Sequence, residues 1–251
     1  MISYYNGSFL EEKDITISPF VGGFEFGKGV FTTLKYENKQ FFNLDKHLKR
    51  LFNSCKVFEI KWHTINFPVI LSELMDRNDL TGSRIKIIVF DENFNKSSML
   101  ISCKPFIINR KPRNITIANG KRADQLVYRH KTLSYFHNLH FNHIAQKHGF
   151  DDCLYLDCKD RVLESSFANI FFIKDNQIFT PSSKLPLLPG IIRGELLSRG
   201  NFHNYQIKEA EIYHKDISKF QSAFLTNSIH GIVAVKRIDD CHFEKPEIEG
   251  L

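Results

Sequence analysis

The sequence has few of the features that assign a protein directly to a class. It contains no run of five like-charged residues, no internal repeat, no paired zinc ligands and no stretch of about 18 uninterrupted apolar residues. These absences disfavour a specific nucleic-acid reader and a protein that spans a membrane. The first residues also lack a basic segment followed by an apolar stretch, so we expect no secretion signal and a cytoplasmic location.

Cysteine is sparse and odd in number. Five cysteines at irregular positions fit reduced thiols in that compartment. The 251 residues, 42% of them hydrophobic, can bury a substantial core in one large domain or two small ones. The net charge of +6 suits an acidic partner, whether nucleic acid, a membrane surface or a small carboxylate or phosphate ligand, and does not choose among them.

Apolar periodicity and turn signals predict an α+β protein with two lobes. Asn6-Gly7 between two apolar runs indicates a β-hairpin. Asp45 is the expected N-cap of a helix that follows a strand ending near Phe42. The other predicted segments are helices over 69–79, over 134–149 and from about Gly190, strands over 84–90, 98–106, 153–157, 169–173 and 177–179, and a polar linker over 107–114.

Three features carry possible chemistry. Lys131 lies in YRHKTLSYFHN (128–138), and a lysine whose pKa is lowered by burial or by a nearby cation is a neutral amine that can form a Schiff base. Glu164 is expected between a turn and a strand, where a carboxylate could keep a pyridine nitrogen protonated. Gly190 in LPGIIRG (188–194) precedes a helix whose N–H groups could hold a phosphate. Two of the three have an ordinary alternative: a solvated lysine for Lys131, and a simple turn for Gly190.

Ordered blocks along nearly the whole chain resemble the class IV aminotransferase family of pyridoxal-phosphate enzymes. The blocks are FGKGVFTTLKY, NLDKHLKRL, KTLSYFHN, DDCLYLDCKDRVLESSFANIFFIKDNQIFTP, LLPGIIRG and FLTNSIHGIVAV. The family includes branched-chain and D-amino-acid aminotransferases and aminodeoxychorismate lyase. The resemblance implies a small N-terminal α+β domain, placed at 1–110, a larger C-terminal pseudo-barrel domain at 111–251, pyridoxal 5'-phosphate in the cleft between them, and usually a homodimer.

The resemblance also implies roles for individual residues. Lys131 would bind the cofactor covalently and then move protons, and Glu164 would pair with the pyridine nitrogen. Tyr135 is expected near the lysine or the ring oxygen. The groups expected to hold the cofactor phosphate are Arg50, the backbone N–H groups of Ile191 and Ile192, Asn227 and Ser228. For Arg50 the alternative is an ordinary arginine on a helix surface.

The segment FTT (31–33) resembles the lyase members, because aminotransferases more often have a glutamate after the aromatic residue. Thr33 would assist proton transfer, or would be a strand residue of the core. Ile192, where aminotransferases commonly have threonine, also favours a lyase. We therefore expect a lyase that converts 4-amino-4-deoxychorismate to 4-aminobenzoate and pyruvate in folate biosynthesis. The alternative is a class IV aminotransferase acting on branched-chain or other amino acids.

The group that would hold the substrate carboxylates is left open. The loop FDENFNKSS (90–98) contains Lys96 but no arginine, which disfavours D-amino-acid specificity, and Arg129, His130 or Lys96 could substitute. A member of the family without turnover and a nucleic-acid binder are the non-catalytic alternatives. We expect no metal site, since the histidines at 137, 140 and 143 have no acidic or cysteine ligand at matching spacing. His230 is expected to contact substrate or to pack.

Overall fold

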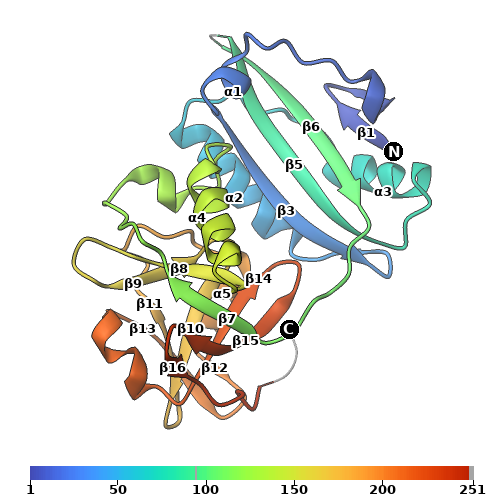
Figure 1. Ribbon diagram of the computed structural model, residues 1–251. Coiled ribbons are helices and arrows are strands. Elements are labelled where there is room, and N and C mark those ends of the chain that lie inside the picture. The colour runs from blue at the N-terminus through green and yellow to red at the C-terminus, as the bar shows by residue number, and fades with distance from the viewer. Residues whose placement is uncertain (94, 249–251) are drawn as a thin grey trace. The chain divides into compact units, whose positions relative to one another are not determined.

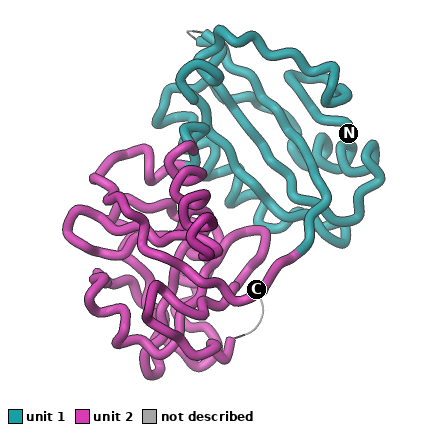
Figure 2. The backbone as a smooth tube through the Cα atoms, in the orientation of Figure 1, with its two compact units in different colours: residues 1–107, 131–134 teal, residues 108–130, 135–251 magenta. Residues whose placement is uncertain are grey.

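The computed structural model describes residues 1–93 and 95–248 and divides the chain into two compact units (Figure 2). Unit 1 comprises Met1–Ile107 together with Lys131–Ser134, and unit 2 comprises Ile108–His130 and Tyr135–Leu251. The short segment Lys131–Ser134 therefore belongs to unit 1, although it lies within the sequence of unit 2. Nothing in the local sequence pattern indicated this return.

Unit 1 is a six-stranded sheet with the strand order β2-β1-β6-β5-β3-β4. All of its pairings are antiparallel, and helices α2 and α3 cover one face (Figure 1). The strands are β1 (Ile2–Tyr5), β2 (Ser8–Glu11), β3 (Gly29–Glu37), β4 (Gln40–Phe41), β5 (Gly82–Asn93) and β6 (Lys96–Lys104). The helices are η1 (Glu12–Asp14), α1 (Gly22–Glu25), α2 (Leu44–Val57) and α3 (Phe67–Arg77).

Alternation along β3 gives the sheet of unit 1 two different faces. Val30 and Leu34 join Ile85 and Ile87 of β5 in a core against the helices, where the contacting side chains include Leu51, Leu71 and Leu74. Phe31 and Thr33 point to the opposite face because successive strand residues alternate.

Two predictions for unit 1, a hairpin and a helix N-cap, have different outcomes. The hairpin at Asn6-Gly7 is confirmed, since Tyr5 pairs with Ser8 and both turn residues have positive φ, at 47° and 100°. The predicted N-cap at Asp45 is wrong. Asn43, with φ of 54°, precedes the helix, and Asp45 lies in its first turn, where a carboxylate still interacts favourably with the helix dipole.

Unit 2 is built around a ten-stranded sheet. Strands β10, β14, β15, β7, β8 and β9 are paired in that order, and β9 also pairs with β10, so these six strands form a closed ring. The strands are β7 (Arg113–Ile117), β8 (Asp152–Leu156), β9 (Val162–Ser165), β10 (Asn169–Lys174), β11 (Gln177–Pro181), β12 (Asn201–Phe202), β13 (Tyr205–Ala210), β14 (Ser222–Asn227), β15 (Gly231–Ile238) and β16 (Cys241–His242). The helices are η2 (Leu126–Arg129), α4 (Phe136–Lys147), α5 (Ile191–Arg199) and η3 (His214–Lys219).

The closed ring encloses an apolar core. Ile115, Leu154 and Ile170, from three of its strands, are fully buried in one cluster. The position of Glu164 corrects one expectation: expected between a turn and a strand, it lies inside β9.

None of the helices in the described part of the chain is long and apolar enough to cross a membrane.

Candidate active site

Lys131 is held on the outer edge of β3 by main-chain hydrogen bonds within unit 1. The Phe31 N–H donates to the Lys131 carbonyl at 2.8 Å, and the Leu133 N–H donates to the Gly29 carbonyl, also at 2.8 Å. A Cβ on Gly29 would lie 2.5 Å from Leu133 Cδ1 and 2.9 Å from Phe90 Cβ, so a larger residue at this position would displace its neighbours. The backbone at Lys131 is therefore fixed to the strand that carries the FTT segment.

The side chain of Phe31 lies beside two amines. Lys131 Nζ is 4.8 Å from the centre of the Phe31 ring, and Lys86 Nζ is 4.4 Å from it, both within the range of cation–π interactions. Lys86 pairs with Thr33 across β5 and β3. Phe31, Thr33 and Lys86 therefore share one face of the sheet.

Lys86 is a candidate that sequence analysis missed. Burial lowers the pKa of Lys86, and the neighbouring Arg84 lowers it further. No carboxylate of residues 1–93 or 95–248 forms an ion pair with Lys86. Its place in an apolar strand was visible in RIKIIVF, but its position opposite Thr33 depends on strand register.

On the opposite face of β3, Arg50 joins a buried polar cluster. Arg50 Nη2 donates to Thr32 Oγ1 at 3.0 Å, and Thr32 Oγ1 lies 2.6 Å from His47 Nδ1. Burial, reinforced by the charges of Arg50 and Lys131, lowers the pKa of His47 to about 3, so its imidazole is neutral at ordinary pH. Arg50 is half-buried and is hydrogen-bonded to β3.

Glu164 is the centre of a buried polar cluster in unit 2. Its side chain is 8% exposed, and Oε1 accepts a hydrogen bond from Arg122 Nη1 at 2.8 Å. Oε2 accepts from Asn169 Nδ2 at 3.2 Å and from the Leu188 N–H at 3.1 Å. These contacts connect β9, β10 and the segment that leads into α5.

Arg122 was also missed, because a single basic residue after a turn looks like a surface residue. Its side chain is 1% exposed, and its guanidinium carbon lies 3.7 Å from the centre of the Tyr155 ring and 4.7 Å from that of Tyr128. Arg122 Nη2 also donates to Asn138 Oδ1 at 3.1 Å. The guanidinium is thus held between aromatic rings and a carboxylate, an environment that suits arginine and not lysine.

Tyr135 belongs to the same region of unit 2. Its hydroxyl donates to the Ser166 carbonyl at 3.2 Å, and Asn138 Nδ2 donates to the same carbonyl at 2.6 Å. Burial raises the pKa of Tyr135, and the Glu164 carboxylate raises it further. Tyr135 is therefore a neutral phenol, able to donate a hydrogen bond.

Helix α5 begins close to Glu164. Gly190 is the N-cap and makes no side-chain capping bond, and Ile191 and Ile192 occupy the first turn, where N–H groups have no partner within the helix. Asn169 Nδ2 donates to the Leu188 carbonyl at 2.9 Å, and a Cβ on Gly190 would lie 1.9 Å from Asn169 Oδ1. Gly190 therefore lets the segment approach Asn169, which connects it to Glu164.

The other two residues expected at the phosphate are Asn227, the last residue of β14, and Ser228 in the turn that follows. Asn227 Oδ1 accepts hydrogen bonds from the N–H groups of Ile229 at 3.0 Å and His230 at 2.8 Å, so this oxygen stabilises the turn that contains Ser228. His230 Nδ1 accepts from the Asn109 N–H at 3.2 Å. Burial lowers the pKa of His230, with a smaller effect from Arg113.

Two of the three groups considered for the substrate carboxylates are engaged elsewhere. Lys96 is highly exposed and pairs with Glu92 at 3.0 Å. Arg129 pairs with Asp124 at 2.6 Å and donates to the Lys184 carbonyl at 2.8 Å. In residues 1–93 and 95–248, no three histidine, cysteine or acidic side chains converge as metal ligands would.

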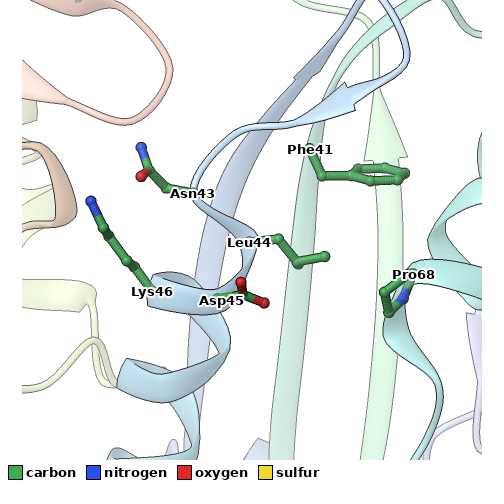
Figure 3. Close-up of a pocket in the computed structure, with 6 residues that line it drawn as sticks. All are labelled: Phe41, Asn43, Leu44, Asp45, Lys46 and Pro68. Atoms are coloured by element: carbon green, nitrogen blue, oxygen red, sulfur yellow. The ribbon is translucent and has the colours of Figure 1, made fainter.

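A separate hollow of about 440 Å³ lies in unit 1 and contains none of these groups. Figure 3 shows Phe41 and Pro68 facing each other across it, while Asn43 and Lys46 point to the other side of the chain. Its remaining lining residues are Leu44 and Asp45. This hollow offers an apolar surface but no nucleophile or buried charge.

A family model for amino-transferase class IV matches residues 29–238, and the chain belongs to this family. It is 23% identical over 256 residues to the aminodeoxychorismate lyase of Bacillus subtilis, covering 96% of this chain and 87% of that protein. Its fold is similar to that of the branched-chain aminotransferase of Thermoproteus uzoniensis solved with norvaline, with a TM-score of 0.90, 18% identity, and coverage of 98% of this chain and 90% of that one.

A hypothetical aminotransferase from Mycobacterium tuberculosis, solved with α-ketoglutarate and PMP, has a TM-score of 0.86, 18% identity, and coverage of 98% of this chain and 94% of that one. These similarities confirm the fold expected from the sequence. The family uses pyridoxal phosphate, which confirms the expected cofactor. Family members include both lyases and aminotransferases.

The groups in the two units fit this cofactor chemically. In unit 1, the Lys131 side chain is a primary amine, the kind of group that bonds to an aldehyde, and the Arg50 guanidinium is the kind of group that binds a phosphate. In unit 2, the Glu164 carboxylate is of the kind that pairs with a pyridine nitrogen, and the N-terminus of α5 is of the kind that binds an anion.

Proposed function

We propose that the protein is a pyridoxal-phosphate-dependent lyase that converts 4-amino-4-deoxychorismate to 4-aminobenzoate and pyruvate in folate biosynthesis. The observation that carries the proposal is the position of Thr33, on the same face of β3 as Phe31, whose ring lies beside Lys131 Nζ. A hydroxyl here suits proton transfer next to the amine. The relative from Bacillus subtilis supports the same choice.

When bound, pyridoxal phosphate supplies an electron sink that stabilises negative charge on the amine-bearing carbon of the substrate. Lys131 would hold the cofactor until the substrate amine takes its place, and the freed Lys131 amine, assisted by the Thr33 hydroxyl, would remove the proton from that carbon. Enolpyruvate would leave from the neighbouring carbon, because its departure makes the ring aromatic. Glu164 would keep a proton on the pyridine nitrogen, and Arg122 would hold the Glu164 carboxylate in place.

The remaining groups would bind and orient. We assign the cofactor phosphate to Arg50, the N–H groups of Ile191 and Ile192, Asn227 and Ser228, and place Tyr135 beside the cofactor. Lys86 is our candidate for a substrate carboxylate, since it is half-buried on the Thr33 face and the described residues offer it no carboxylate partner. It replaces Lys96 and Arg129, which are engaged elsewhere.

A class IV aminotransferase acting on branched-chain or other amino acids is the second candidate, favoured by the fold similarity to the Thermoproteus enzyme. Ile192 distinguishes the two, because it has no hydroxyl and the lyase assignment takes only backbone N–H groups from this turn. A hydroxyl at position 192 would instead fit the aminotransferases. We also propose that the protein is a homodimer and that its location is cytoplasmic. Light scattering of the purified chain tests whether it is a homodimer.

The first experiment compares wild type with Lys131→Ala after addition of pyridoxal phosphate. We expect wild type to develop a visible absorption band and to retain the cofactor after borohydride reduction, and the variant to do neither. A band in wild type with no pyruvate release from 4-amino-4-deoxychorismate would contradict the lyase. Amino-group transfer from branched-chain amino acids to α-ketoglutarate would then identify the aminotransferase.

A second comparison tests Thr33. Thr33→Val removes the hydroxyl and keeps the shape of the side chain, whereas Thr33→Ser keeps the hydroxyl. We expect Thr33→Val to lower the rate of pyruvate release about a hundredfold, within the range for a group that assists proton transfer. Thr33→Ser should retain most of the rate. Equal rates in the two variants would remove Thr33 from the proposed mechanism.

A further inference from the structure

His47, Thr32 and Arg50 form a chain of hydrogen bonds beneath the sheet of unit 1. His47 and Arg50 lie three residues apart on α2, on the face that contacts β3, and Thr32 stands between their polar ends. His47 is 1% exposed and Thr32 is fully buried, so water does not compete for these bonds. The proposed function assigns a role to Arg50 only and leaves the other two unexplained.

The donors and acceptors of this chain fix its direction. Arg50 has only N–H donors, so Thr32 Oγ1 accepts from Nη2. If the Thr32 hydroxyl donates its proton to His47 Nδ1, only the N–H at Nε2 of the histidine is without a partner. If Nδ1 carried the proton instead, both the Thr32 hydroxyl proton and Nε2 would lack one. The first arrangement leaves fewer buried groups unsatisfied.

A purely structural role does not account for this histidine. His47 Nε2 is buried and has no hydrogen-bond partner among the described residues, which costs stability that an apolar residue of similar size would avoid. The feature that an apolar residue could not provide is the acceptor at Nδ1. That acceptor orients the Thr32 hydroxyl, whose lone pairs then face Arg50 Nη2.

We propose that His47 is a positioning residue: through Thr32 it fixes the Arg50 guanidinium in the orientation that binds the phosphate group of the cofactor. This inference rests on the proposed function, because it takes Arg50 as a phosphate ligand. A guanidinium held by one fixed hydrogen bond loses less freedom when an anion binds, so affinity for the phosphate rises.

The neutral state of His47 is part of this arrangement. Arg50 and Lys131 are the charged groups whose fields act on it, and both are cations. Burial and these two charges keep the pKa of His47 low. The histidine therefore accepts the Thr32 proton throughout the ordinary pH range and does not add a third positive charge next to Arg50.

The test measures the affinity of the full chain, freed of cofactor, for pyridoxal phosphate and for pyridoxal, which has the same aldehyde and ring but no phosphate. His47→Leu and Thr32→Val remove the chain of hydrogen bonds. His47→Asn and Thr32→Ser are matched controls, because asparagine carries a polar atom as many bonds from Cα as Nδ1, and serine keeps the hydroxyl.

We expect His47→Leu and Thr32→Val to lower the ratio of the two affinities about tenfold, as for a lost hydrogen bond to a charged group. The loss should fall on pyridoxal phosphate alone, and the controls should keep most of the ratio. General damage to the fold would weaken binding of both compounds equally and overturn the inference. An unchanged ratio in the Leu and Val variants would also overturn it.

The outcome for wild type separates this inference from the proposed function. If wild type binds neither compound, the proposed function fails and the inference fails with it. If wild type prefers pyridoxal phosphate, Arg50→Leu removes that preference, and His47→Leu does not, only the inference fails. These two results differ, so failure of the proposed function and failure of this inference alone can be told apart.

Discussion

Arg122 and Glu164 form an ion pair, with Nη1 and Oε1 2.8 Å apart and both side chains almost completely buried. Removing the arginine leaves a carboxylate in a site where water does not replace the lost partner. We expect Arg122→Met to lower the free energy of unfolding by about 3–5 kcal/mol. Urea unfolding at pH 7 measures this change.

The double variant Arg122→Met with Glu164→Gln is the control for this pair. Because the second change removes the uncompensated charge, the double variant should be more stable than Arg122→Met alone. Simple addition of the two single effects would mean that the ion pair contributes nothing of its own.

Gly190 gives a second prediction. A Cβ at this position would lie 1.9 Å from Asn169 Oδ1, so Gly190→Ala must displace the side chain that binds Glu164 and the Leu188 carbonyl. We expect a loss of about 1–3 kcal/mol of stability and weaker binding of pyridoxal phosphate. Calorimetry and absorbance titration measure the two effects.

Gly194, in the same helix, is the matched control for Gly190. A Cβ there has no heavy atom within 4 Å, so Gly194→Ala should be neutral or should stabilise the helix by up to about 1 kcal/mol. If both substitutions had the same effect, the close approach at Gly190 would have no role.

Protonation of His47 should lower the free energy of unfolding as the pH falls. The pKa of His47 is about 3 in the folded protein, against its usual value of 6.5, so the unfolded chain binds more protons between these values. Stability is therefore complete above pH 6.5 and is lost as the pH falls towards 3, at up to about 1.4 kcal/mol per pH unit. His47→Asn should lose less stability than wild type between pH 7 and pH 4.5 in urea unfolding; equal losses would contradict this account.

Lys86 should act on substrate binding. We expect Lys86→Met to raise the KM for 4-amino-4-deoxychorismate about tenfold to a hundredfold, because a charge-assisted hydrogen bond to a carboxylate is lost. Lys96→Met is the control, since Lys96 is exposed and already paired with Glu92. Steady-state kinetics of pyruvate release distinguishes the two, and an equal KM in both variants would exclude Lys86 as the carboxylate ligand.

Local sequence determined much of the secondary structure. Asn6-Gly7 accepts positive φ at both turn positions, and Gly149 accepts it after α4, so these boundaries depend on a few neighbouring residues. The start of α2 was misplaced because Asn43 adopts φ of 54°, a choice that a sequence pattern does not distinguish from capping at Asp45.

The candidate site shows the limit of that approach. Its groups meet through distant parts of the chain: Arg122 with Glu164, Lys86 with Thr33, and Lys131 with Phe31. Such contacts depend on strand register and on the closure of β9 against β10, which no local pattern records. Family resemblance supplied Lys131, Glu164 and Arg50, but Lys86, His47 and Arg122 required the three-dimensional structure.

The return of Lys131–Ser134 to unit 1 limits how this protein can be dissected. The chain passes between units at 107/108, 130/131 and 134/135, so no single cut separates them. A fragment that ends at Ile107 would leave the Phe31 N–H and the Gly29 carbonyl on an unpaired strand edge, open to pairing with other chains. Studies of unit 1 in isolation therefore need the segment supplied as a peptide or joined by a linker.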